Sequence, residues 1–228
     1  MKNKEMDSKK YQFSGKTISC YYNADFAKIS DLTDKENTIL IMDENIFAKQ
    51  PGKFFGWKTI VLKAGEQFKN QKAVDEIIDQ LIKLNADRQS FIIGVGGGVV
   101  TDIAGYAASV YMRGIKFAFA PTSILAMVDA SIGGKNGVDV GVYKNLVGVI
   151  NHPEFLVYDY SFLETLPHEE WINGFAEIIK HACIKDESMF RFLEEKTVQD
   201  FQSSKENIGK LIERNVDIKY NVVANDER

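Results

Sequence analysis

The chain contains few residues of the types that bind metals or build disulfide frameworks. Its 228 residues include two cysteines, Cys20 and Cys183, and three histidines, His152, His168 and His181. Two cysteines so far apart suit a reducing cytoplasm and argue against a disulfide framework, and there is no C-x-x-C metal motif. A tight zinc site usually needs at least three nitrogen, sulfur or oxygen ligands, so the histidines and cysteines are too few to predict one.

The chain also lacks a strong net charge and a long apolar run. It has 28 basic and 32 acidic residues, a formal net charge of −4 and no basic cluster, which argues against nucleic-acid binding. The apolar runs are short and interrupted by glycine or charge, so no segment is predicted to span a membrane. Residues 1–10 are polar and lysine-rich without the apolar core of a secretory signal, and we interpret them as a frayed lead-in.

What the chain does have is a regular alternation of apolar segments, and 45% of its residues are hydrophobic, which is enough for a real core. Strand-like segments at 38–42, 59–62, 91–95, 117–121 and 155–159 alternate with helix-like segments at 71–84 and 101–112. This pattern predicts an α/β fold with a Rossmann-like parallel sheet. From about residue 166 only helical patterns follow, at 167–183, 189–193 and 208–223. We therefore expect an NAD-type α/β domain at 1–165 and the start of an all-helical domain at 166–228.

The glycine run 94–98 is the most informative local feature. It follows an apolar segment and opens an amphipathic one, which predicts a strand, a glycine turn and a helix. Such a turn lets the backbone approach a ligand, and the helix N-terminus offers unpaired N–H groups to a pyrophosphate. A turn without a ligand is the alternative, and the dinucleotide pattern is incomplete because Val99 stands where a third glycine is usual. Asp43, with Asn45 beyond it, is placed either to hold a ribose or to cap a helix.

Two residues of the helical part raise the question of a metal site. Glu177 and His181 are four residues apart and share a helix face, so both could bind one zinc ion. The H-E-x-x-H arrangement is absent, however, and E-x-x-x-H pairs are common on protein surfaces. The residues alone favour the surface pair.

A set of short motifs, taken together and in order, resembles 3-dehydroquinate synthase. The motifs are Asp43-x-Asn45, Gly65-Glu66-Gln67-x-Lys69, Gly96-Gly97-Gly98-Val99-Val100-x-Asp102, Arg113-Gly114, Pro121-Thr122-Ser123, Asp129-x-Ser131-Ile132-Gly133-Gly134-Lys135, Lys144-Asn145-Leu146-Val147-Gly148 and Ala176-Glu177-Ile178-Ile179-Lys180. Each is weak alone, but the ordered set is highly specific and spans most of the chain.

The resemblance implies an enzyme of the shikimate route that works in the cytoplasm as a homodimer. It converts a sugar-acid phosphate, 3-deoxy-D-arabino-heptulosonate 7-phosphate, into 3-dehydroquinate and phosphate. NAD+ would serve as a recycled oxidant and a zinc ion, or Co²⁺, as the metal. Oxidising a ring hydroxyl to a ketone acidifies the neighbouring C–H bond, so that phosphate can leave by elimination.

The resemblance also assigns roles to residues. The nucleotide site would comprise Asp43, Asn45, Glu66, Lys69, Gly97, Gly98, Val99, Asp102, Thr122, Ser123, Lys144 and the loop of Phe162, Leu163, Glu164 and Thr165. The substrate would face Asp129, Lys135, Asn145, Lys180 and Lys219, while Arg113 would reach the substrate phosphate in the partner subunit. Glu177 matches the zinc-binding glutamate, and His181 does not match a ligand.

In the family, the other two zinc ligands are histidines of the helical domain, and no histidine follows His181 here. We expect their motifs beyond Arg228, and we expect this chain alone to bind zinc poorly and to turn over slowly or not at all. Two alternatives remain: a related sugar-phosphate cyclase or metal-dependent NAD alcohol dehydrogenase, and a non-catalytic module that binds NAD or dimerises.

Overall fold

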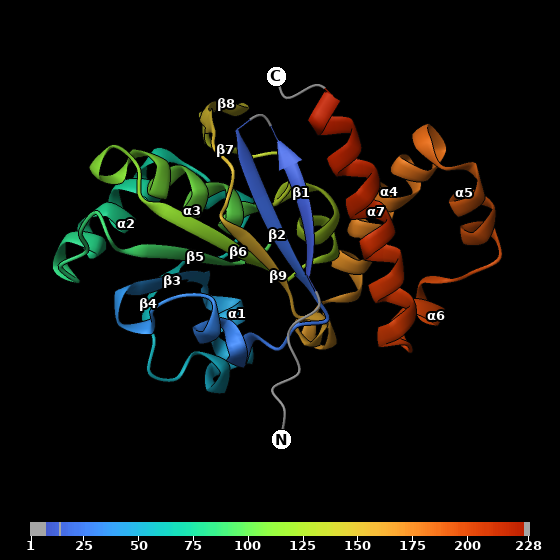
Figure 1. Ribbon diagram of the computed structural model, residues 1–228, viewed down its shortest axis with the longest axis horizontal. Helices are drawn as coiled ribbons and strands as arrows, with labels where there is room; N and C mark the ends of the chain where they lie inside the picture. Colours follow the sequence, from blue (N-terminus) through green and yellow to red (C-terminus); the bar gives the residue numbers. More distant parts are fainter. Residues whose placement is uncertain (1–7, 14, 226–228) are drawn as a thin grey trace.

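The computed structural model describes residues 8–13 and 15–225. Its centre is a seven-stranded sheet (Figure 1) with the spatial order β1 (Ser8–Phe13), β2 (Lys16–Tyr22), β9 (Phe155–Tyr158), β6 (Lys116–Pro121), β5 (Phe91–Gly96), β3 (Thr38–Asp43) and β4 (Lys58–Leu62). In this spatial order, all neighbouring strands are parallel except β1, which is antiparallel to β2. The predicted α/β fold with a largely parallel sheet is therefore confirmed.

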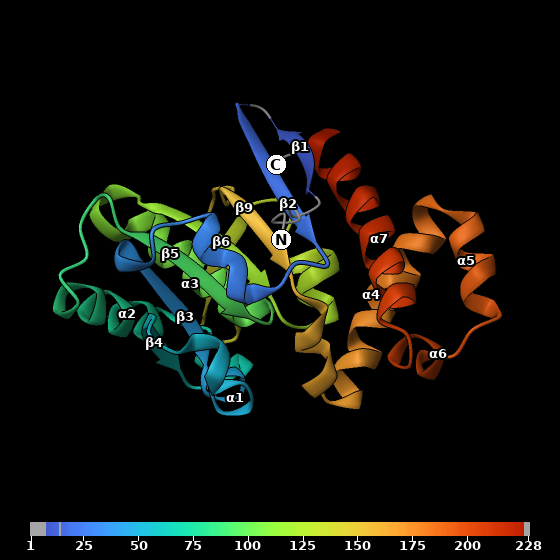
Figure 2. The same ribbon diagram turned by 60° about the horizontal axis from the view of Figure 1, so that its bottom comes forward.

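Besides short 3-10 and π-helical turns, the described residues form a hairpin and seven α-helices. The hairpin pairs β7 (Lys135–Val140) with β8 (Tyr143–Ile150) in antiparallel register. The α-helices are α1 (Glu44–Lys49), α2 (Gln71–Lys83), α3 (Gly98–Val110), α4 (His168–Lys185), α5 (Glu187–Glu194), α6 (Val198–Gln202) and α7 (Lys205–Asn225). Figures 1 and 2 show that α4–α7 gather on one side of the sheet, next to the β1–β2 edge, while α2 and α3 lie at its other end.

The central strands are continuously apolar because both of their faces are covered. In β3, Ile39 and Ile41 belong to the core shared with α2 and α3, whereas Leu40 and Met42 belong to a second core on the opposite face. The alternation of side chains along a strand sends neighbouring residues to different cores. As a result, every residue of β3 except Asp43 at its end is buried.

The five predicted strands and both predicted helices of the first part are present, with ends shifted by a few residues. The two strands at the β1 edge and the β7–β8 hairpin were not predicted. The interpretation of residues 1–10 as a frayed lead-in is wrong for residues 8–10, which form part of β1; residues 1–7 lie outside the described part of the chain. Tertiary contacts explain the difference, since Lys9 and Tyr11 contact Asp217 of α7 at 2.5 and 2.6 Å.

The helical part begins where the sequence predicted, with Pro167 directly before α4. Helix α4 approaches the chain after β6 very closely, because a Cβ atom on Gly174 would come within 2.4 Å of the Cβ atom of Ile124. The π-helical turn Ala126–Ala130 follows at once and carries Asp129. Glycine at this crossing therefore lets α4 bring Glu177 close to Asp129. Among the described residues, no helix combines the length and apolar character needed to cross a bilayer.

Candidate active site

A large cleft lies where the parallel strands end. It has a volume of about 1180 Å³ and follows the carboxyl ends of β3, β4, β5 and β6, the usual place for a ligand in an open α/β sheet. The cleft is closed on one side by the β7–β8 hairpin and on the other by the chain leading into α4. Segments far apart in the sequence therefore meet at one edge.

Most of the predicted site residues line this cleft. They are Asp43, Asn45, Glu66, Lys69, Gly97, Gly98, Val99, Asp102, Thr122, Ser123, Phe162 and Thr165 from the nucleotide set, and Asp129, Lys135, Asn145 and Lys219 from the substrate set. Their convergence was not imposed by the sequence pattern, because they come from strands, helices and loops between positions 43 and 219. The structure thus brings together the residues that the resemblance groups.

Six of the predicted residues do not line the cleft: Arg113, Lys144, Leu163, Glu164, Glu177 and Lys180. Leu163 is buried in the core, and Glu164 and Arg113 are exposed. Lys144 lies at the start of β8 and pairs with Glu66 at 3.1 Å. The predictions for these residues stay untested.

The glycine run forms the tight junction between β5 and α3. The prediction explained these glycines by a sharp turn of the backbone, but the structure explains them by a lack of space for side chains. None of its four glycines has a positive φ. Space is what excludes side chains there: a Cβ atom on Gly96 would meet Val100 at 2.6 Å, and one on Gly98 would meet Ala130 at 3.2 Å. Gly97 is the N-cap of α3 and makes no side-chain cap bond, so the first N–H groups of the helix face the cleft without a side-chain acceptor from the cap.

Thr122 and Ser123 form the neighbouring wall, directly after β6. Both are buried, and the Thr122 amide donates to the carbonyl of Gly96 at 2.9 Å. The Ser123 hydroxyl accepts from the Ala126 amide at 3.2 Å. These bonds hold the end of β6 beside the glycine junction.

Asp43 caps a helix, which is one of the two roles that the sequence left open. Its Oδ1 accepts from the Ile46 amide at 3.0 Å, so it caps α1. It also lines the cleft beside Asn45. Burial raises the pKa of its carboxyl above the usual value, and the backbone hydrogen bonds of the cap oppose that shift. A helix cap and a ligand-facing carboxylate are thus compatible here.

Lys69 is the central cation of the cleft. Its ammonium is almost fully buried and donates to Asp102 Oδ2 at 2.5 Å and to Asn145 Oδ1 at 2.6 Å. Burial raises the pKa of the Asp102 carboxyl to about 6, against the attraction of Lys69. Because Asp102 belongs to α3 and Asn145 to β8, one lysine ties the hairpin to the glycine-junction helix.

Asn145 itself depends on an unusual backbone. Its φ is +54°, a left-handed conformation that asparagine tolerates better than most residues. The Asn145 amide donates to Asp139 Oδ1 at 2.7 Å, and the Asp139 amide donates to the carbonyl of Lys69 at 2.8 Å. The hairpin is therefore fastened to the Lys69 loop by backbone and side chain.

The substrate set converges at the other end of the cleft. Lys219 of α7 forms an ion pair with Asp129 Oδ1, and Lys135 enters at the first residue of β7. The cleft thus has an end lined by glycine backbone and hydroxyls, and an end lined by two lysines and a carboxylate. The first suits a pyrophosphate and the second an anionic substrate.

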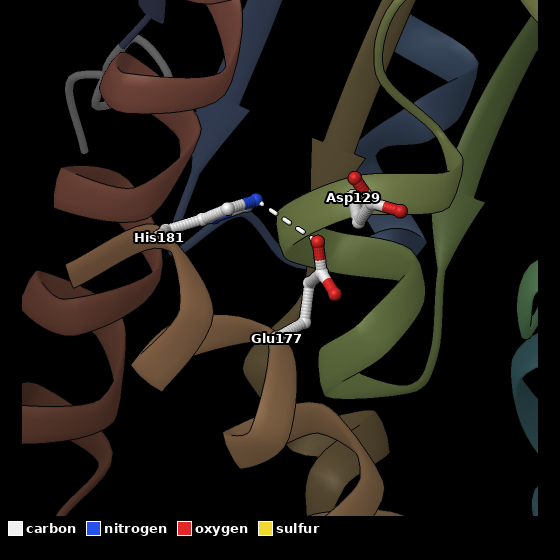
Figure 3. Close-up of side chains that lie close together, drawn as sticks. All are labelled: Asp129, Glu177 and His181. Atoms are coloured by element: carbon white, nitrogen blue, oxygen red, sulfur yellow. Dashed lines mark ion pairs between the residues drawn. The ribbon is translucent and has the colours of Figure 1, made fainter. Parts of the chain in front are cut away.

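Beside that second end lies a group of three possible metal ligands, drawn in Figure 3: Asp129, Glu177 and His181. One ligand atom from each falls within 4.8 Å of the others. His181 Nε2 lies 3.2 Å from Glu177 Oε1, and Lys180 Nζ lies 2.7 Å from the same oxygen. Burial lowers the pKa of the His181 imidazole. The pair is not the solvated surface pair that the residues alone favoured, because His181 is buried.

Sequence reasoning missed most of the hairpin that roofs the cleft. Leu146, Val147 and Ile150 of β8 line it, and Asn173 of α4 and Lys49 of α1 add polar groups. The motif 144–148 marked this segment as functional, but it gave no sign of a strand because its alternation is weak and most of its side chains are exposed.

Sequence comparisons agree with this geometry. The profile described as 3-dehydroquinate synthase N-terminal matches residues 59–173, and the profile described as 3-dehydroquinate synthase C-terminal matches residues 174–228. The 3-dehydroquinate synthase of Prochlorococcus marinus (strain AS9601) is 39% identical over 206 residues, covering 86% of this chain and 57% of that protein. That of Campylobacter concisus (strain 13826) is 42% identical over 164 residues, covering 72% and 46%. The chain thus spans about half the length of these relatives.

A solved structure supports the fold. The 2-epi-5-epi-valiolone synthase of Streptomyces hygroscopicus subsp. jinggangensis 5008, with NAD+ and Zn²⁺ bound, superposes with a TM-score of 0.83 over 99% of this chain and 64% of that one, at 24% identity. Since the two profiles together cover residues 59–228, and the cleft gathers the ordered motifs, the chain belongs to the 3-dehydroquinate synthase family.

Proposed function

We propose that this chain carries the nucleotide site and part of the substrate and metal site of a 3-dehydroquinate synthase. The activity would convert 3-deoxy-D-arabino-heptulosonate 7-phosphate into 3-dehydroquinate and phosphate. The observation that carries the proposal is the single cleft in which the glycine junction, Asp43 and Lys69 meet Lys135, Asn145 and Lys219. The relatives named above, which bear this enzyme's name, support the choice of substrate.

In the proposed nucleotide site, the α3 N-terminus at Gly97 and Gly98 would take the pyrophosphate of NAD+, because its N–H groups and dipole favour an anion. Asp43, Asn45 and Glu66 would face the adenosine half. Asp102, held by Lys69, would lie near the second ribose. The chain's own contribution is a preformed, largely buried polar wall that orients the cofactor.

At the substrate end, Lys135, Lys219 and Asn145 would bind the phosphate and carboxylate of the substrate by charge-assisted hydrogen bonds. Lys180 would join them by turning away from Glu177, since its side chain is more than half exposed. When bound, NAD+ supplies a hydride acceptor and the divalent metal polarises the hydroxyl being oxidised. Glu177 would be a ligand of that metal, and its position close to Asp129, which lines the cleft, fits a cation.

We further propose a homodimer and a division into an NAD-binding part, 1–165, and a helical part, 166–228. Arg113 supports the first idea, because it is exposed outside the cleft, as a residue serving a partner's site would be. A cytoplasmic location is part of the proposal, supported by the free state of both Cys20 and Cys183.

The proposal is tested in two steps. NAD+ is titrated into the purified chain by calorimetry, and the product of the natural open reading frame is assayed for phosphate release from the heptulosonate phosphate with NAD+ and Zn²⁺. Binding in the first assay and phosphate plus 3-dehydroquinate in the second are expected. Release of phosphate only from a different sugar phosphate would assign the protein to a related cyclase, and absence of NAD+ binding would refute the nucleotide site.

A further inference from the structure

We propose that Asp139 is a positioning residue, which sets the orientation of Asn145 in the cleft and ties the substrate side to the nucleotide side. The family resemblance assigns Asn145 to the substrate and Lys69 to the nucleotide, and it assigns no role to Asp139. The inference rests on the proposed function only for the identity of the molecules that bind in the cleft. The role of Asp139 follows from the contacts of this chain.

Asp139, Lys69 and Asn145 form a closed ring of hydrogen bonds. The Asp139 amide donates to the carbonyl of Lys69 at 2.8 Å, and Asp139 Oδ1 accepts from the Asn145 amide at 2.7 Å. Lys69 Nζ closes the ring, because it donates to Asn145 Oδ1 at 2.6 Å. Each of the three residues therefore donates one bond and accepts another, and a shift of any one of them disturbs two bonds at once.

A register shift in the hairpin aims the Asp139 side chain at Asn145. The pairing of β7 with β8 is irregular between Val138 and Val140, which places Asp139 at a β-bulge. Bulges bend a strand and re-aim the side chains beside them. Asp139 also forms a parallel bridge with Asn70, the N-cap of α2. The carboxylate is thus carried by a backbone that is fastened to the start of a helix.

The ring fixes the backbone of Asn145. A φ of +54° puts this residue in the left-handed region, which a residue with a side chain occupies at a cost that local hydrogen bonds offset. The bond from the Asn145 amide to the Asp139 carboxylate is charge-assisted and therefore stronger than a bond between neutral groups. Asp139 is therefore the partner that holds the left-handed conformation.

The ring also fixes which end of the Asn145 amide faces the cleft. An ammonium group only donates, so the oxygen of the amide faces the buried Lys69. Nδ2 is then the end left over, and it has no hydrogen-bond partner among the described residues. Asn145 lines the cleft together with Lys135 and Lys219. It therefore offers a neutral N–H donor of fixed direction to a substrate oxygen, beside two ammonium groups.

Loss of the Asp139 carboxylate is expected to affect the two sides of the cleft unequally. Lys69 keeps its ion pair with Asp102 at 2.5 Å, so the nucleotide side retains its main polar contact. The Asp139 amide, which holds the Lys69 loop, belongs to the backbone and survives a change of side chain. Only the orientation of Asn145 depends directly on the carboxylate. A carboxylate that merely stabilised the hairpin would instead loosen both sides alike.

The test compares Asp139→Leu, which removes the acceptor, with Asp139→Asn, which keeps an acceptor oxygen. Phosphate release is assayed with the product of the natural open reading frame, and NAD+ affinity is measured by calorimetry. Asp139→Leu is expected to raise the KM for the heptulosonate phosphate at least about tenfold and to change the Kd for NAD+ less than about threefold. Asp139→Asn is expected to keep both values within about threefold of the original.

Two controls accompany these variants. Val142→Ala changes an exposed side chain in the turn of the same hairpin and is expected to match the original protein. If Asp139→Leu folds poorly, Asp139→Ala removes the same acceptor without added bulk and carries the same expectations.

A double-variant cycle shows whether Asp139 acts through Asn145. In an Asn145→Ala background, Asp139→Leu is expected to raise the KM by less than a further factor of about three, because the group that it orients is already gone. A full additive rise in the double variant would overturn the proposal. It would also be overturned by equal losses of NAD+ affinity and of KM, or by Asp139→Asn behaving as Asp139→Leu does.

Hydrogen exchange of the Asn145 backbone amide, followed by NMR in the purified chain, tests the same contact without a substrate. The amide is expected to exchange about tenfold faster in Asp139→Leu than in the original chain or in Asp139→Asn. Unchanged exchange overturns the role of Asp139 whatever the activity. Faster exchange in a protein that releases no phosphate from the heptulosonate phosphate would refute the proposed function and leave the positioning role standing.

Discussion

The buried Asp102 carboxyl gives the sharpest test of the cleft, because its contribution to the free energy of unfolding depends on pH. Its pKa is raised from 3.8 to about 6, chiefly by burial, although Lys69 opposes the shift. A raised pKa means that the folded state holds the proton more tightly than the unfolded chain. This stabilisation is complete only well below the unfolded pKa of 3.8 and is lost as the pH rises through 6. The whole shift corresponds to about 3 kcal/mol, of which about 2 kcal/mol is lost between pH 4 and pH 7.

Asp102→Asn removes the titrating group and keeps the shape of the side chain. The free energy of unfolding, measured by urea denaturation at several pH values, is compared with that of the original chain. The difference between the two is expected to change by about 2 kcal/mol from pH 4 to pH 7, in favour of the variant at the higher pH. Only the change with pH is predicted and not the difference in the free energy of unfolding at any one pH, because the variant also changes the surroundings of the Lys69 ammonium.

Asp79→Asn is the matched control, since Asp79 is an exposed acid on α2. Its curve is expected to run parallel to that of the original chain over the same range. Parallel curves for Asp102→Asn as well would mean that the Asp102 carboxyl is not buried, and the described packing of Lys69, Asp102 and the hairpin would be refuted.

Three further predictions concern the glycine junction and the helical part. Gly97→Ala is expected to weaken NAD+ binding at least tenfold in calorimetry. Its Tm is expected to change little, because the added Cβ would meet only Ser123 Oγ at 3.4 Å. Gly96→Ala is expected to lower the Tm through overpacking, so equal losses of Tm in the two variants would contradict this reasoning. Asp186→Ala removes the N-cap of α5 and a bidentate partner of an arginine, so urea denaturation should report a loss of about 1–2 kcal/mol at pH 7. Because the same contacts hold the Asp186 pKa at about 2, the loss is expected to vanish only as the pH falls toward that value, and a loss unchanged at pH 2 would count against it. Gly174→Ala is expected to cost about 1–3 kcal/mol by the same measurement, and a stable variant would show that α4 does not cross the chain after β6 so closely.

Several features of the molecule followed from the sequence because they depend on short-range patterns. The apolar run 38–42 indicated a strand, and the spacing of Val74, Ile77, Ile78, Leu81 and Ile82 predicted one covered helix face. That face is buried at Val74, Ile77 and Leu81, but the prediction is wrong for Ile82, which is exposed. The glycine run marked the β5–α3 junction, since so many missing side chains imply a close approach of backbone. The ordered motifs added the family, which no single periodicity could supply.

The edges of the sheet depended on contacts between distant residues. Strand β1 is polar and half-exposed, and it is held by Asp217, more than two hundred positions away. The β7–β8 hairpin is likewise exposed over most of β8 and fixed by Lys69 and Asp139. Local propensity is weak in such segments, so the tertiary partner decides whether they pair.

The sequence by itself determined the five central strands, the glycine junction and the family, because local periodicity and motif order are written along the chain. The tertiary structure alone decided how charges are paired and which side chains share a site. His181 is the clearest case: its spacing from Glu177 placed both on one helix face, but only the fold brings Asp129 of the π-helical turn close to both. Which side chains come together depends on the relative position of separate elements, and that position is fixed by packing rather than by any one segment.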